Sequence, residues 1–199
     1  YIGEDNKNIN NSYDGWIDLF GWGTGNSPTD YSSTDSQYTI SFTDWGINEI
    51  EGDSVNTWRT LNSTEYVYII QNRKNADSLR GIAEVNGVNG LILLPDNWIC
   101  PAGLTFKSGY LSESEPFSSH QSFTVEEWRI FESLGAIFLP AGGYRISKTI
   151  HLISQYGCYW LNEKLNSTSC KHGRFTSKSI GMENISPSYG LNVRLVKDL

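Results

Sequence analysis

The sequence predicts an α+β domain in which two helices pack on short, twisted antiparallel sheets joined by long irregular loops. Three observations support this prediction. Two helix starts carry the same capping motif, two apolar runs of strand length each end at a proline, and the last third of the chain alternates strands with turns. The 199 residues are typical of one domain, so we expect residues 1–199 to form a single unit.

The first helix start lies at Asn62. Its side chain can accept from the first free backbone N–H groups of a helix, and Glu65, three positions later, can reach back to the N–H of Asn62. Tyr66 and Ile70 then lie on one apolar helical stripe. We therefore predict a helix over residues 63–73.

The second helix start repeats this pattern. Thr124 is the capping residue and Glu127 follows three positions later. The predicted helix covers residues 125–134 and stops at Gly135, which suits the left-handed backbone of a helix C-terminus.

Two apolar runs indicate buried strands. Residues 81–88 alternate, residues 87–90 carry a turn signal, and residues 91–94 form a buried run that Pro95 ends, so together they predict a hairpin. Residues 136–140 repeat the pattern of an apolar run ended by proline.

The last third of the chain reads as antiparallel strands separated by joints rich in Asn, Ser and Gly. The predicted strands are residues 157–161, 171–176, 179–182 and 191–196. The last of these ties the C-terminal segment into a sheet. Near the other end, residues 13–20 predict a strand or a tight aromatic turn.

The composition argues against two kinds of partner. The net charge is −7, from 15 basic and 22 acidic residues, and no long run of Lys or Arg occurs, so nucleic-acid binding is disfavoured. The longest apolar stretch, near residues 91–95, has the length of a strand, so no transmembrane segment is expected. The sequence opens at Tyr1 without an initiator Met, and we expect an export signal or a first strand to be missing upstream.

Four motifs resemble one known family. They are Trp58–Leu61 followed by Glu65, Phe138–Arg145, Tyr156–Trp160 and Tyr189–Asp198. Together they resemble the formylglycine-generating-enzyme (sulfatase-modifying factor) family, and most closely its non-enzymatic relatives in gut Bacteroidetes and in the Fibrobacter major paralogous domain. The resemblance covers about residues 13–199. It implies a C-type-lectin-like fold, secretion or display at the cell surface, and core positions for Trp58, Trp128 and Trp160.

The resemblance implies binding and no catalysis. Enzymes of this family bind copper through a closely spaced cysteine pair, whereas Cys158 and Cys170 lie well apart in this sequence. We therefore expect an exported, surface-associated binding or adhesion module with no catalytic residues. It would recognise a glycan or a surface protein through two long loops, residues 27–41 and 97–122. Two alternatives stay open: an oxidase relative of the formylglycine-generating type, and a structural subunit of a surface or pilus assembly.

Two places are candidate ligand-binding sites. Asp96, Asn97 and Trp98 combine side-chain oxygens with an aromatic ring, which suits a sugar or a calcium ion, although the run Pro-Asp-Asn is also strong turn chemistry. Trp22, in a glycine-rich loop, is either an exposed aromatic platform or a core residue beside Trp16. We expect no metal site and no cofactor, with calcium left open as a ligand of Asp96 and Asn97.

The cysteines and histidines allow few further sites. Cys158 and Cys170 flank a predicted hairpin and form a disulfide across it, or else Cys100, Cys158 and Cys170 are three buried free thiols. None of the three histidines has a cysteine or carboxylate at metal-ligand spacing, so we expect structural or surface roles for His120, His151 and His172.

Overall fold

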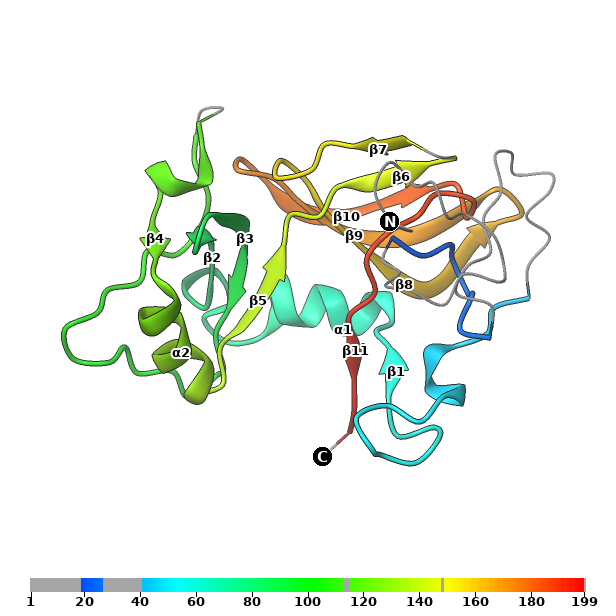
Figure 1. Ribbon diagram of the computed structural model, residues 1–199, viewed down its shortest axis with the longest axis horizontal. Coiled ribbons are helices and arrows are strands. Elements are labelled where there is room, and N and C mark those ends of the chain that lie inside the picture. The colour runs from blue at the N-terminus through cyan, green and yellow to red at the C-terminus, as the bar shows by residue number, and fades with distance from the viewer. Residues whose placement is uncertain (1–18, 27–40, 113–114, 148, 199) are drawn as a thin grey trace.

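The computed structural model describes residues 19–26, 41–112, 115–147 and 149–198. Within these residues the fold is mixed α+β, with two α-helices and four small sheets. Figure 1 shows two halves side by side, one formed by residues 79–141 and the other mainly by residues 142–198. Two predicted segments, residues 13–20 and 27–41, fall almost wholly outside the described residues.

The first half is built on a four-stranded sheet with the order β4-β2-β3-β5. Its strands are β2 (Arg80–Val85), β3 (Val88–Leu93), β4 (Ser122–Phe123) and β5 (Ile137–Pro140). The β2–β3 and β3–β5 pairs are antiparallel, but β4 runs parallel to β2, so the expectation of purely antiparallel sheets is wrong. The chain leaves β3 and returns to the far edge of β2 through a long irregular crossing, which allows this direction.

The hairpin turn lies earlier than predicted. Asn86 and Gly87 have φ values of +48° and +79°, so these two residues form the turn and β3 begins at Val88. Gly90, which was expected in the turn, lies within β3. A Cβ there would stand 2.5 Å from the carbonyl oxygen of Leu139, so this glycine permits the close approach of β5.

The helix α2 (Val125–Ser133) begins as predicted and ends one residue before the predicted end, with Leu134 as its cap. Thr124 Oγ1 accepts from the N–H of Glu127 at 3.2 Å, and the Glu127 carboxylate accepts from the N–H of Thr124 at 2.8 Å. The helix buries Phe131 against the sheet, and Gly135 follows with a φ of +91°. This half therefore has its own apolar core under α2.

The helix α1 (Ser63–Val67) also has the predicted capping box at Asn62 and Glu65. It continues as a π-helical turn, η4 (Tyr68–Asn72), instead of one regular helix. The cap at Arg73 matches the predicted end. Ile70 and Tyr66 are buried against Leu161, so the predicted apolar stripe is the face that packs.

Arg73 joins the end of this helix to the first sheet. Its guanidinium donates to the carbonyl oxygens of Ile69 and Leu94 at 2.8 Å each and of Leu79 at 3.3 Å. The side chain is 8% exposed and also pairs with Asp96 at 3.2 Å. One guanidinium thus holds three separate chain segments together.

The second half holds three smaller sheets. They are the β10-β9-β8 sheet and the β6-β7 and β1-β11 ladders. Their strands are β1 (Arg59–Thr60), β6 (Tyr144–Ile146), β7 (Thr149–His151), β8 (Gly157–Asn166), β9 (Ser169–Phe175), β10 (Ile180–Ile185) and β11 (Leu195–Val196). The remaining short helices are η3 (Trp45–Ile47), η5 (Ala76–Ser78) and η6 (Phe117–Ser119).

The last predicted strand is shorter than expected. Only Leu195 and Val196 pair as a strand, with Thr60 and Arg59 of β1. Leu191 and Asn192 instead make isolated bridges to Phe20 and to Tyr159 of β8. Residues 191–196 therefore pair first with Phe20 and β8 and then with β1, so the C-terminal segment is tied into the fold as expected.

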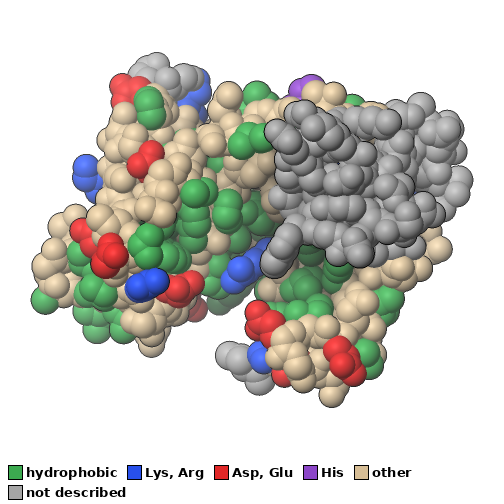
Figure 2. Space-filling view, viewed as in Figure 1, with side chains coloured by type: hydrophobic (Ala, Val, Ile, Leu, Met, Phe, Trp, Pro, Cys, Tyr) green, Lys and Arg blue, Asp and Glu red, His purple; other side chains and the backbone are tan. Residues whose placement is uncertain are grey.

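The two halves meet through a shared apolar cluster. Ile82, Leu91 and Leu139 of the first sheet pack with Tyr159 and Phe175 of the second. Figure 2 shows hydrophobic side chains gathered around β5, which lies between the halves.

No helix among the described residues is long and apolar enough to cross a bilayer.

Replacing Arg73 tests the link between helix and sheet. We expect Arg73→Met to lower the free energy of unfolding by about 2–4 kcal/mol, because the carbonyl oxygens of Ile69 and Leu94 lose their guanidinium donor. Asp96→Asn should change it by less than about 1 kcal/mol, since that carboxylate is 65% exposed. Urea unfolding measures both. Arg129→Met, on the exposed side of α2, is the matched control, and a loss as large as that of Arg73→Met would contradict the prediction.

Candidate functional site

A cleft of about 690 Å³ opens between the two halves. It is formed by the segment before η6, the β7–β8 loop, the β9–β10 turn and one residue of β3. Its lining residues are Asn89, Glu115–Phe117, Ile153–Tyr156 and Thr176–Lys178. Its volume lies within the range of pockets that bind small ligands.

Buried aromatic rings set the position of the cleft. Phe175, which is 1% exposed, packs edge-to-face on Phe117 at 6.5 Å and stacks on Tyr159 at 6.3 Å. Phe117 lines the cleft and Phe175 directly precedes the lining residue Thr176, so their contact fixes the distance between two walls. The ring of Phe175 also covers Gly157, where a Cβ would collide with it.

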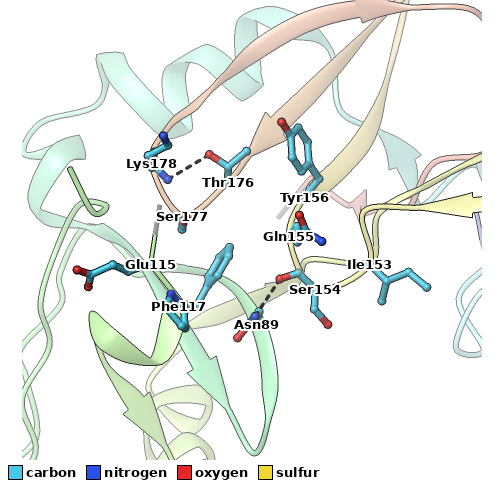
Figure 3. A pocket seen from close by; sticks show the side chains of 11 residues that line it. Asn89, Glu115, Phe117, Ile153, Ser154, Gln155, Tyr156, Thr176, Ser177 and Lys178 are labelled. Carbon is cyan, nitrogen blue, oxygen red and sulfur yellow. Dashed lines mark hydrogen bonds between the residues drawn. The ribbon is translucent and has the colours of Figure 1, made fainter. Parts of the chain in front are cut away.

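Hydrogen bonds hold the loops in place. Asn89 Nδ2 donates to the carbonyl oxygen of Ser154 at 2.9 Å, which anchors the β7–β8 loop on β3 (Figure 3). Thr176 Oγ1 accepts from the N–H groups of Lys178 and Ser179, which fixes the β9–β10 turn. The cleft is therefore formed before any ligand arrives.

Several polar side chains of the cleft have no hydrogen bond or ion pair in the described part of the chain. Within the described residues no hydrogen bond or ion pair engages the side chains of Glu115, Ser154, Gln155, Ser177 and Lys178. Figure 3 shows Glu115 and Lys178 on one side of the cleft and Gln155 and Ile153 on the other. Such uncommitted donors and acceptors are what a ligand requires for orientation.

Sequence reasoning found only part of this cleft. The segment predicted as a loop, residues 97–122, supplies Glu115, Pro116 and Phe117. The other two walls were missed, because short polar joints between strands carry no signal beyond that of a turn. Only the fold brings residues 153–156 and 176–178 together.

The predicted site at Asp96, Asn97 and Trp98 is a turn. The N–H of Trp98 donates to the carbonyl oxygen of Pro95 at 3.1 Å, and the Asp96 carboxylate pairs with Arg73. The ring of Trp98 packs on Phe131 at 5.0 Å between centroids. These contacts favour the turn alternative, and none of these residues lines the cleft.

Trp22 lies in the interior. Its side chain is 3% exposed and its indole N–H donates to the carbonyl oxygen of Leu161 at 2.8 Å. The ring packs on Phe42, 4.8 Å away. The expectation of an exposed platform is therefore wrong for this ring, which supports the core alternative. Trp16 lies outside the described residues.

The cysteine pair does not face across the hairpin. Cys158 pairs in register with Arg174, four residues along β9 from Cys170, so the two lie on the order of 13 Å apart along the strands. A disulfide needs Cα atoms within about 7 Å. All three thiols are free, but Cys100 is exposed, so only Cys158 and Cys170 match the alternative of buried free thiols.

Burial sets the chemistry of two groups on this sheet. It raises the pKa of the Cys158 thiol to about 12, so this thiol stays protonated at neutral pH. Burial, with a smaller effect of Arg174, lowers the pKa of His172 to about 4. His172 Nδ1 is buried and has no hydrogen-bond partner in the described part of the chain, which agrees with a structural role.

The described residues contain no group of three or more His, Cys, Asp or Glu side chains that could hold a metal ion. A calcium ion at Asp96 would compete with the guanidinium of Arg73 for the same carboxylate. Calcium binding at Asp96 and Asn97 thus stays a prediction, and the geometry gives it no further support.

Thiol labelling tests the placement of the cysteines. Iodoacetamide should modify Cys100 in the folded protein and leave Cys158 and Cys170 unmodified, because they are buried and Cys158 is held as a thiol. In urea without reductant all three should react, as mass spectrometry will show. A protein that takes up one label in urea would contain the disulfide that the register excludes.

The depressed pKa of His172 predicts a loss of stability in acid. The unfolded chain takes up the proton near pH 6.5 and the folded chain only near pH 4, so stability falls as the pH drops through this window. By pH 4.5 the loss from this residue should be roughly 2–3 kcal/mol. Urea unfolding at pH 7 and 4.5 should show a smaller loss for His172→Leu than for the wild type. Equal losses would contradict the assignment.

Comparisons with known proteins do not assign the chain to a family, so the sequence motifs remain the basis of the proposed resemblance. The chain matches no protein-family profile, no curated protein and no solved structure. The α+β architecture and the cleft are therefore what the structure contributes, and the resemblance described above remains a prediction.

Proposed function

We propose that this domain is an exported, surface-associated binding or adhesion module that holds its ligand in the cleft and performs no catalysis. The observation that carries the proposal is the set of uncommitted polar side chains around a cleft of about 690 Å³. The ligand is a glycan or a surface protein, and it contacts loops that a rigid scaffold presents.

The construction of the cleft supports binding. The buried Phe117 is one of its lining residues, and its walls are fixed by the Asn89–Ser154 hydrogen bond and by the Thr176 turn. A ligand therefore meets walls that need little ordering, which reduces the entropic cost of association. Recognition through irregular loops also agrees with the proposed C-type-lectin-like fold and with secretion to the cell surface.

The placement of the cysteines supports a module without oxidase chemistry. A copper site of the formylglycine-generating type requires two thiolates on one metal ion. Cys158 and Cys170 lie four register positions apart, and Cys158 is held as a neutral thiol. The oxidase relative is therefore the weaker alternative. A structural subunit of a surface or pilus assembly predicts oligomers of the isolated domain, which light scattering detects.

A steric block of the cleft tests the proposal. The wild-type domain should bind saturably on an array of glycans and immobilised surface proteins. Ser177→Arg should abolish this binding, because the longer side chain enters the cleft from the β9–β10 turn. The measurement is array signal together with the melting temperature, which should be unchanged.

Ser167→Arg, at the exposed tip between β8 and β9, is the matched control and should bind like the wild type. Equal binding by Ser177→Arg and the wild type would place the ligand elsewhere. A blank array for the wild type would count against the binding module itself.

A further inference from the structure

We infer that the ligand of the cleft is an extended peptide segment of a protein partner, with a basic side chain opposite Glu115 and an acidic side chain opposite Lys178. This inference rests on the proposed function and names its ligand class. It depends on three features of the lining: the two charges at its edge, Glu115 and Lys178, the neutral amide of Gln155 on one wall, and the covering of the Phe117 and Tyr156 rings by other parts of the domain.

The rim charges are opposite in sign and unpaired. Most ion pairs of the described residues join charges on neighbouring segments, such as Lys171 with Glu163 and Arg174 with Glu183. Glu115 and Lys178 line the same side of the cleft but form no ion pair with each other or with other described residues. A ligand that carries both signs would satisfy both groups, and a peptide supplies them from two side chains.

The neutral groups fit a peptide backbone. The N–H groups of Ser154, Gln155 and Tyr156 are already bonded within the domain, so the wall contributes side chains instead of a strand edge. The uncommitted amide of Gln155 offers a donor and an acceptor together, which matches the N–H and C=O of a peptide unit. Ile153, 56% exposed on the same wall, adds an aliphatic contact.

The aromatic rings of the cleft do not offer an open platform for a sugar. Phe117 is buried and packs on Phe175. The Tyr156 ring is covered on one face by the Arg174 guanidinium, 5.3 Å from the ring centroid. Because Phe117 is buried and one face of Tyr156 is covered, the cleft presents mainly charge, amide and aliphatic surface, and these favour a peptide over a saccharide.

A peptide library tests the inference. A random dodecapeptide library displayed on phage is selected on the immobilised wild-type domain, and enriched peptides are synthesised and titrated by fluorescence polarisation. We expect enriched sequences to share one basic and one acidic position. Glu115→Lys and Lys178→Glu should each weaken binding roughly 10-fold, and higher salt should weaken the wild-type complex.

Two controls isolate the rim charges. Glu132→Lys and Lys74→Glu change exposed charges that do not line the cleft, and each should bind the peptide like the wild type. A peptide with its acidic and basic positions exchanged should bind the double variant Glu115→Lys/Lys178→Glu better than it binds the wild type. Indifference of the selected peptides to both rim variants would overturn the inference.

The outcomes separate this inference from the proposed function. If the library gives no enrichment while a glycan on the array binds and Ser177→Arg abolishes that binding, the peptide ligand is wrong and the binding module stands. If the library and the array are both blank, both proposals fail. Enrichment that depends on Glu115 and Lys178 supports both.

Discussion

The apolar contact between the two halves is the constraint on which the candidate site depends. Phe175 lies between Tyr159 and Phe117, and its ring fills the space above Gly157. The chain leaves this cluster directly into the walls of the cleft, at Thr176 on one side. The same burial that stabilises the fold therefore sets the width of the cleft. A glycine at residue 157 is needed because any larger side chain would displace the ring that joins the halves.

A few polar side chains then connect elements that the apolar clusters leave separate. Arg73 donates to three carbonyl oxygens, one at the end of the first helix and two next to the start of β2 and the end of β3. Ser63, Glu163 and Lys171 form a hydrogen-bonded group that attaches the start of that helix to β8 and β9. Both ends of α1 and η4 are thus held by side chains, which suits a short helix with a π-helical turn that has little stability of its own.

Several features that depend on residues close together in the sequence were predicted correctly, and several that depend on distant residues were not. Capping boxes are local, so Asn62 and Thr124 could be assigned from neighbouring residues, and both helices begin where expected. Pairing partners are not local. The parallel direction of β4 and the separation of Cys158 from Cys170 depend on register, which no single segment encodes. The role of Trp22 likewise depends on Leu161, a partner far away in sequence.

The candidate site shows the same limit more strongly. Asp96 drew attention because acidic turns bind ions, yet the residue that pairs with it is Arg73, which the sequence places in a helix. The cleft instead uses ordinary polar residues from joints between strands, such as Gln155 and Lys178. Their significance comes from the position of their side chains, which stand around one cavity and have no hydrogen-bond or ion-pair partner among the described residues. Buried or paired polar groups maintain a fold, whereas unpaired polar groups around a preformed cavity remain available to a ligand. Among the described residues, the cleft brings several such unpaired side chains together.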